Sequence, residues 1–176
     1  MNQADSPEMS RPMKIEPVVR VVDVYPYRRR RNGTEFLVCR RASHEQFAGQ
    51  WRMIAGKIER GETAWQAGLR ELQEETQYVP LHYWTIPSLN LLYQWHRDRV
   101  NLIPAFAAEV DKDPVLNHEH NAFQWLPAEE AAAHLTWPEQ RRLLLLAAQM
   151  LSEGVPAQLV IPRREVLATL RGRAAA

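Results

Sequence analysis

A short acidic segment is the strongest sign of chemistry in this chain. Glu71, Glu74 and Glu75 follow one another closely, and in a helix that turns by about 100° per residue they share one sector of the surface. Two unit charges about 7 Å apart repel by roughly 2 kcal/mol at an effective dielectric near 20, so a bound cation would relieve the repulsion. Carboxylate oxygens are hard ligands that suit Mg²⁺ or Mn²⁺. The segment therefore predicts a divalent-metal site, with a solvated helix face of Glu and Arg pairs as the alternative.

The residues around this segment predict a helix that starts at Thr63 and ends before Pro80. Thr63 followed by Gln66 is a capping-box pattern, and proline cannot continue a helix. An apolar stripe beside the glutamates must face the core, and it consists of Trp65, Leu69 and Leu72. The three carboxylates are therefore expected at the margin of the core.

A wider spacing of residues surrounds the glutamates. It reads Gly56, five residues, Glu62, seven residues, Arg70-Glu71-Leu72, one residue, Glu74-Glu75. This spacing resembles the Nudix box, which here runs from Gly56 to Tyr78. The pattern has a glycine and an aliphatic residue where this chain has Gln77 and Tyr78. Because glycine there lets the chain turn with positive φ, Gln77 predicts a different exit from the helix.

The resemblance to the Nudix hydrolase family spans roughly residues 15 to 150. It implies an α+β fold, an α/β/α sandwich with a mixed β-sheet, which also fits the irregular alternation of expected strands and helices. It further implies an enzyme that hydrolyses a diphosphate linkage in a compound built on a nucleoside diphosphate. The cofactor would be Mg²⁺, with Mn²⁺ as a possible substitute.

The resemblance also assigns roles to residues of this sequence. Glu71, Glu74 and Glu75 would hold the metal together with the backbone carbonyl of Ala55. Arg70 and Glu62 would pair and brace the loop that follows Gly56 against the helix. The proton of the attacking water would pass to Glu71 or to Glu119.

Several further residues are candidates for substrate contact. Arg40 and Arg41 could reach a phosphate, although a salt bridge at the end of a strand is an equal alternative. Trp51 could stack on a base, whereas packing in the core is the stronger interpretation for one of six tryptophans. The histidines on either side of Glu119, His118 and His120, are interpreted as polar loop residues.

The substrate itself is less closely defined by the sequence. The stretch around Glu119 and Trp125, followed by Trp137, resembles bacterial dATP and dihydroneopterin triphosphate pyrophosphohydrolases. A small-molecule nucleoside triphosphate or a close analogue is therefore expected, with release of pyrophosphate. A dinucleoside polyphosphate hydrolase is one alternative. The other is a nucleotide-binding module that no longer turns over substrate, for which Gln77 is the supporting observation.

The remaining elements can be placed by apolar patterns and turn signals. A β-hairpin is expected from residues 18–27 and 36–39, with Asn32 and Gly33 in the turn and the arginines 28–31 as a solvated run beside it. Short strands are expected at residues 51–55 and 122–126, and a pair of longer strands at residues 86–95 and 100–110. Further helices are expected at residues 128–134, 138–152 and 163–170.

Length and composition limit the possible classes. A chain of 176 residues with 45% hydrophobic and 24% charged residues fits one globular domain. We expect a flexible leader at residues 1–14, the Nudix domain at residues 15–152 and a C-terminal extension at residues 153–176. The apolar residues of the extension could serve a homodimer interface or pack on their own domain.

Charge and cysteine content exclude further classes of function. The net charge of +1 gives no general case for binding nucleic acid. The single cysteine, Cys39, excludes an internal disulfide and a thiolate zinc cluster, and its apolar surroundings predict a buried thiol. The chain has no apolar run of the roughly 18 residues that a membrane span needs and no visible secretory signal, so a cytoplasmic location is expected.

Overall fold

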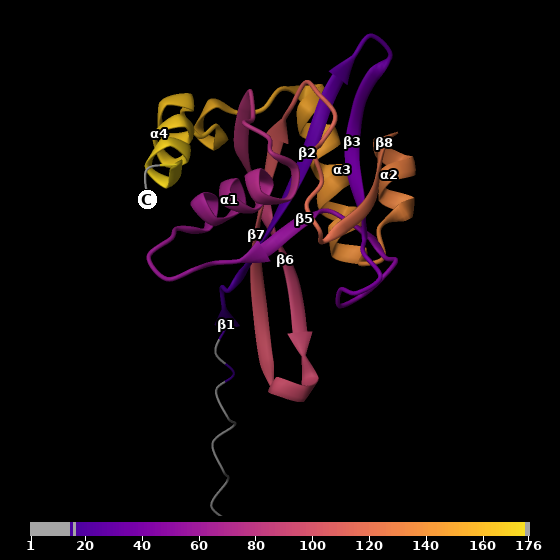
Figure 1. Ribbon diagram of the computed structural model, residues 1–176, viewed down its shortest axis with the longest axis vertical. Coiled ribbons are helices and arrows are strands. Elements are labelled where there is room, and N and C mark those ends of the chain that lie inside the picture. Colours follow the sequence, from indigo (N-terminus) through magenta and orange to yellow (C-terminus); the bar gives the residue numbers. More distant parts are fainter. Residues whose placement is uncertain (1–14, 16, 175–176) are drawn as a thin grey trace, which may run out of the picture.

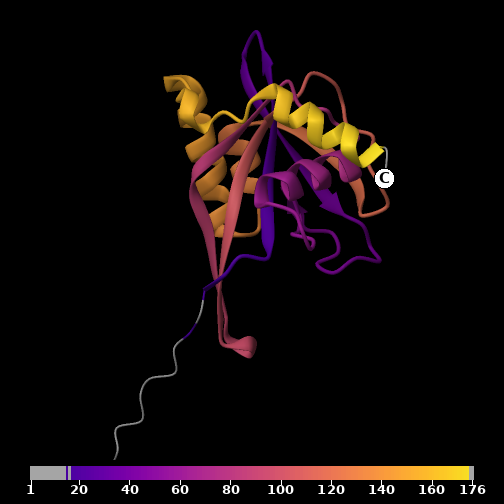
Figure 2. The same ribbon diagram turned by 90° about the vertical axis from the view of Figure 1, so that its left-hand side faces the viewer.

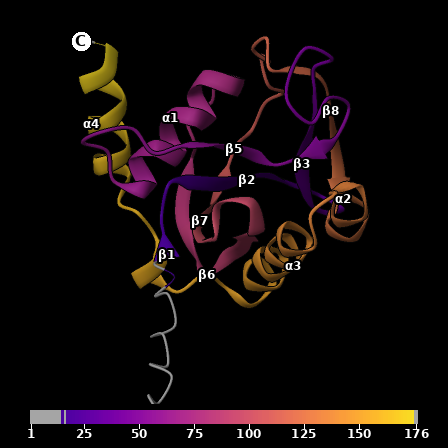
Figure 3. The ribbon, with the colours of Figure 1, turned by 90° about the horizontal axis from the view of Figure 1, so that it is seen from below.

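The computed structural model describes residue 15 and residues 17–174. A β-sheet lies between two layers of helices (Figures 1 and 2). One face carries α1 (Ala64–Thr76) and α4 (Arg163–Ala174), and the other carries α2 (Ala128–His134) and α3 (Pro138–Glu153). The view from below places α1 and α3 on opposite sides of the strands (Figure 3). The expected α+β sandwich is confirmed, and the expected leader lies outside the described residues.

The sheet has eight strands and is mixed. Its central path runs β1, β7, β2, β3, β4, while β5 pairs with β2, β6 with β7 and β8 with β3. The β7 strand runs parallel to β1 and β2, and the other pairs are antiparallel. The strands are β1 (Pro17–Val18), β2 (Val21–Arg30), β3 (Gly33–Arg41), β4 (Trp51–Arg52), β5 (Ile54–Lys57), β6 (His82–Gln94), β7 (Arg99–Glu109) and β8 (His120–Pro127).

The central strand β2 separates two hydrophobic cores. Val22 and Val24 face α1, whereas Tyr25 and Tyr27 face α3, as alternation along a strand requires. Cys39 lies in the core on the α1 side, where burial raises the pKa of its thiol. The longest described helix, α3, is too short and polar to cross a membrane, and so is every other helix in the described ranges.

The C-terminal residues pack on their own domain. Val166 and Leu170 of α4 are buried in the core beside α1. Before α4, the backbone amide of Ile161 donates to the carbonyl of Tyr83 at 2.9 Å. The helix continues to Ala174 rather than stopping at Leu170 as expected, which brings its last turn close to α1.

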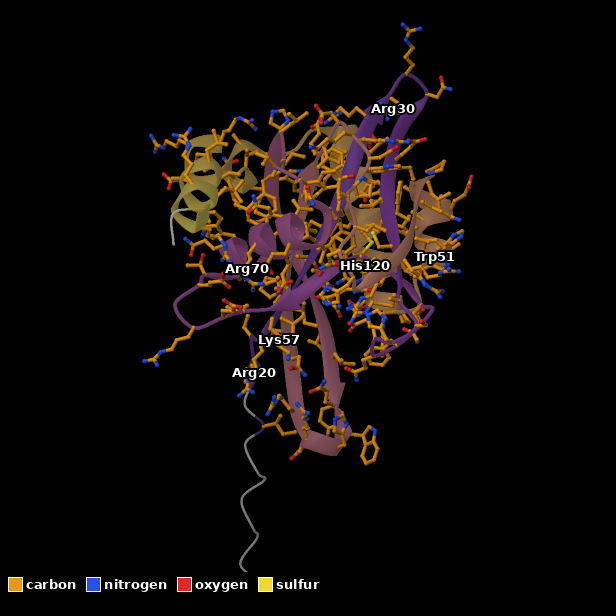
Figure 4. All side chains as sticks on the ribbon, viewed as in Figure 1. Arg20, Arg30, Trp51, Lys57, Arg70 and His120 are labelled. Carbon is orange, nitrogen blue, oxygen red and sulfur yellow. The ribbon has the colours of Figure 1, made fainter. Side chains whose placement is uncertain are left out.

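The arginine run at the β2–β3 hairpin divides into two parts. Arg30 and Arg31 are exposed near the tip, as expected (Figure 4). The expectation of a solvated side chain is wrong for Arg28, which donates to Glu35 at 2.6 Å and lies 4.3 Å above the ring of Trp125. Arg28 belongs to the body of β2, so its side chain crosses neighbouring strands instead of reaching into solvent.

The exit from α1 differs from the one expected. Gln77 adopts φ 58° and ψ 25°, the left-handed conformation that glycine takes at this place, and its amide donates to the carbonyl of Gln73 at 2.8 Å. The next residue, Tyr78, is buried and its hydroxyl donates to the carbonyl of Lys112. Because Tyr78 is held in this way, the chain makes the same turn without glycine.

We expect Gln77→Gly to stabilise the fold by about 0.5–1 kcal/mol, because a side chain makes the left-handed conformation unfavourable. Urea unfolding would measure the change. The matched control is Gln73→Gly, inside the same helix, which should lose about 1 kcal/mol. Equal losses in the two variants would contradict this account of the helix exit.

Candidate active site

The pairing of β2 with β5 places the loop before α1 against the helix. Ala55 pairs with Asp23 and Gly56 with Val22. A Cβ atom built at position 56 would lie 1.8 Å from Cδ of Glu71. The backbone of β5 and the carboxylate of Glu71 can therefore approach each other only because residue 56 is glycine.

Arg70 connects this loop to the acidic segment. Its guanidinium is bidentate to Glu62, with Nε at 2.9 Å and Nη2 at 3.1 Å. Nη1 donates to Glu71 at 2.7 Å and to Glu74 at 3.1 Å, and Nη2 also reaches the carbonyl of Lys57 at 2.6 Å. Burial alone would lower the pKa of Arg70, but the hydrogen bonds to Glu62 and Glu71 raise it. Arg70 thus pairs with Glu62, as the resemblance implies, and Figure 4 shows Arg70 near Lys57.

A second arginine reaches the same carboxylates from α4. Arg173 contacts Glu62 at 2.7 Å through Nη1 and Glu74 at 3.2 Å through Nη2. The sequence did not predict this contact, because the expected helix ends at Leu170, before Arg173. The signal in the sequence was the pair of arginines Arg171 and Arg173, because positive charges are favourable in the last turn of a helix. A helix that includes them is long enough to reach α1.

Glu75 is held by a buried histidine. Its Oε2 lies 2.5 Å from Nε2 of His120, and both side chains are almost completely buried. The interpretation of His120 as a polar loop residue is therefore wrong, whereas His118 is exposed as expected. Burial raises the pKa of Glu75 and His120 opposes the shift. Among the described residues, no partner reaches Oε1 of Glu75 or Nδ1 of His120.

The segment before β8 caps the end of α1. The amide of Val115 donates to the carbonyl of Thr76 at 3.1 Å, and that of Asn117 donates to the carbonyl of Glu75 at 3.2 Å. These bonds satisfy two carbonyls that a helix end leaves free. They also fix the position of His120, only a few residues further along the chain.

Glu119 is placed beside the site by an irregularity between β3 and β8. The register shifts between Arg40, which pairs with Ala122, and Arg41, which pairs with His120. Arg41 donates to Glu119 and, at 2.9 Å, to Glu45. Glu119 is near enough to Glu75 for its charge to raise the pKa of that carboxyl.

The carboxylates are paired with cations rather than arranged as a ready-made metal cage. Across residue 15 and residues 17–174, no three Asp, Glu, His or Cys side chains converge as a metal-binding group. Burial raises the pKa of Glu71, with Arg70 opposing it and the charges of Glu75 and Glu74 adding to the rise. The atoms that could coordinate an ion are the carboxylate oxygens of Glu71, Glu74 and Glu75. Among the described residues, Oε1 of Glu75 is buried and has no hydrogen-bond partner. These oxygens suit a hard divalent cation.

A cleft of about 620 Å³ opens between the β6–β7 hairpin and the start of α3. Its lining includes the aromatic residues Phe47, Tyr93, Trp95 and Trp137 and the polar residues Asp23, Arg52, Asn90 and Gln140. Burial lowers the pKa of Arg52, while the charges of Asp23, Glu75 and Glu119 oppose this shift. Arg52 therefore connects the cleft electrostatically to the carboxylates.

The cleft is lined by aromatic residues other than the one singled out in the sequence. Trp51 packs edge-on against His134, with ring centroids 5.8 Å apart, and Arg40 lies over its ring and donates to Asn121. Figure 4 shows Trp51 on the side of the molecule away from Arg70. Neither Trp51 nor Arg40 belongs to the cleft lining.

We expect His120→Leu to lower the free energy of unfolding by about 1–3 kcal/mol, because Glu75 is left buried without its donor. Urea unfolding would measure the loss, and His118→Leu, at an exposed site, should change little. The double variant Glu75→Leu, His120→Leu should recover part of the stability. If the double variant is less stable than His120→Leu, the buried pair does not have this energetic role.

Comparisons with known proteins identify the family of the chain. Residues 17–147 match the family model described as the NUDIX domain. The chain is 32% identical over 122 residues to the CTP pyrophosphohydrolase of Escherichia coli, covering 65% of this chain and 82% of that protein. In fold it is similar to the Ap4A hydrolase of C. elegans, with a TM-score of 0.65, 21% identity and coverage of 78% and 100%. It is also similar to the dihydroneopterin triphosphate pyrophosphohydrolase of E. coli, with a TM-score of 0.63, 22% identity and coverage of 77% and 99%. The family model spans more than half of the chain, and the protein belongs to the Nudix family.

Proposed function

We propose that this protein is a metal-dependent pyrophosphohydrolase that cleaves a diphosphate linkage in a nucleoside triphosphate or a close analogue and releases pyrophosphate. The supporting observation is the electrostatic connection, through Arg52, between a cleft with aromatic walls and the carboxylates of Glu75 and Glu119. A base in the cleft would place its phosphates toward these carboxylates. The names of the E. coli relatives, a CTP and a dihydroneopterin triphosphate pyrophosphohydrolase, support a triphosphate substrate.

Mg²⁺, or Mn²⁺ in its place, would be held by Glu71, Glu74 and Glu75 with the backbone carbonyl of Ala55. When bound, the ion supplies charge neutralisation at the diphosphate and a more acidic water. The partners that now occupy the carboxylates, Arg70 and His120, would keep them oriented while one oxygen of each turns to the ion.

Two carboxylates can take the proton from the attacking water. Glu71 lies against Gly56 of β5, the strand that also carries Ala55. Glu119 is held by Arg41, and its backbone amide donates to Oδ1 of Asn117 at 3.0 Å. Arg41 and Arg52 add positive charge on the path from the cleft to the carboxylates, which favours the binding of phosphate there.

A dinucleoside polyphosphate is the second candidate substrate. Trp95 lies at the cleft and is 80% exposed, so it could stack on a second base. The non-catalytic alternative loses its support, because Gln77 takes the backbone conformation of the usual glycine.

Release of pyrophosphate and phosphate from purified protein tests the proposal. The panel should include nucleoside triphosphates, dihydroneopterin triphosphate, dinucleoside polyphosphates and nucleotide sugars, each with Mg²⁺, Mn²⁺ or EDTA. We expect turnover of triphosphates that EDTA abolishes. Turnover that persists in EDTA would contradict the metal, and turnover of dinucleoside polyphosphates alone would select the second candidate.

Glu74→Gln should reduce kcat by about 100-fold or more while the fold is kept, because it removes one ligand charge with little change in volume. Steady-state kinetics over a range of Mg²⁺ concentrations would measure the loss. Glu129→Gln, the same change at an exposed position of α2, is the matched control. Full activity of Glu74→Gln would show that Glu74 is not a ligand.

Gly56→Ala should abolish most activity with only a small change in thermal stability. The added Cβ would displace the carboxylate of Glu71 and break its hydrogen bond from Arg70. The cost to the fold stays small because Arg70 keeps its bonds to Glu62 and Lys57. Kinetics and thermal unfolding of the same preparation would separate the two effects. Gly61→Ala, at an open position with positive φ, is the reverse control, because it strains the backbone without touching Glu71.

A further inference from the structure

The floor of the cleft is a buried polar cluster centred on Asp23. The carboxylate accepts a hydrogen bond from Nδ2 of Asn90 at 2.9 Å and another from Nε2 of Gln140 at 3.2 Å. All three side chains are less than a tenth exposed, and all three line the cleft. They come from β2, β6 and the first turn of α3, so three separate parts of the chain meet at this floor.

The carboxylate fixes the orientation of both amides. An ionised carboxylate only accepts hydrogen bonds, so Asn90 and Gln140 must each turn their nitrogen toward Asp23 and their oxygen away from it. Burial raises the pKa of Asp23, whereas the hydrogen bond from Asn90 and the positive charge of Arg52 oppose the shift and favour the ionised form.

One of these amide oxygens lacks a partner. Oε1 of Gln140 is buried, and no donor among the described residues reaches it. A buried acceptor without a donor is costly, whereas a ligand that brings an N–H group to it recovers the lost hydrogen bond. The lining also holds Phe47 and Trp137, whose rings pack edge-on with centroids 6.1 Å apart, and flat heterocycles stack on such walls.

We propose that Gln140 selects a heterocyclic base with an exocyclic amino group, as in cytosine, adenine, guanine or a pterin, over one with only oxo groups. The amino group donates to Oε1 of Gln140. An oxo group at the same place is itself an acceptor, so it would face Oε1 without forming a hydrogen bond. This selection rests on the proposed function, because it assumes that the cleft receives the base of the substrate. Asp23 acts as a positioning residue, since it keeps the acceptor of Gln140 turned toward the ligand.

The test uses nucleoside monophosphates, which contain no diphosphate linkage and cannot be turned over. Dissociation constants of CMP, UMP, AMP and IMP would be measured by calorimetry with the full protein and Mg²⁺. CMP and UMP, like AMP and IMP, differ by exchange of an amino for an oxo group. We expect the amino member of at least one pair to bind about tenfold or more tightly, the range that one unsatisfied buried hydrogen bond gives.

Two variants assign the preference to the floor of the cleft. Gln140→Met keeps the approximate volume and removes the acceptor, so the ratio within the pair should fall toward one through weaker binding of the amino member. Asp23→Asn should also lower the ratio, because an amide at position 23 allows Gln140 to turn its nitrogen to the ligand. Gln149→Met, the same change at an exposed position of α3, should leave the ratio unchanged.

These binding measurements test the selection of the base by Gln140 independently of the hydrolysis reaction. Equal binding within both pairs, tighter binding of the oxo members, or no binding of any monophosphate would overturn it. An unchanged ratio in Gln140→Met and Asp23→Asn would remove Gln140 as the selecting residue. A protein that binds CMP or AMP selectively but hydrolyses no triphosphate would contradict the proposed function and leave the selection in place.

Discussion

The buried guanidinium of Arg70 determines how the rest of the site is arranged. It joins Glu62 and the carbonyl of Lys57, on the loop before α1, to Glu71 and Glu74 on the helix. A buried cation is tolerated only when it is fully paired, so the loop and the helix must keep this relative position. Loss of Arg70 would leave Glu71 without this cation, and Glu62 and Glu74 with only Arg173. The same contact therefore stabilises the fold and positions the acidic groups.

The central strand β2 connects the acidic segment to the cleft. Its backbone pairs with Ala55 and Gly56, and the side chain of Asp23, at the same level, forms the floor of the cleft. Arg52 lies on β4, which pairs with β3, and the charges of Asp23, Glu75 and Glu119 all act on it. The proposed metal site and the proposed base site therefore both depend on the pairing of β2 with β5 near Asp23. A change in this pairing would displace both.

Local patterns in the sequence were sufficient to predict most of the fold and the acidic segment. The helix Ala128–His134 has the expected bounds, and the capping residues Thr63 and Gln66 form hydrogen bonds at the start of α1. The contacts that could not be predicted join distant segments: His120 with Glu75 and Arg173 with Glu74. They depend on strand register and on the packing of α4, which residue spacing does not encode. The aromatic lining of the cleft was missed for the same reason, because its residues come from separate loops.

The position of a bound Mn²⁺ ion, located by its anomalous scattering in crystals of this protein, tests the central claim most directly. We expect an ion with Glu71, Glu74, Glu75 and the carbonyl of Ala55 among its ligands, because these oxygens suit a hard divalent cation. Arg173 should then have left Glu74, while His120 still holds Oε2 of Glu75. An ion bound only by other residues, or no ion in crystals of protein that turns over substrate with Mn²⁺, would contradict the account.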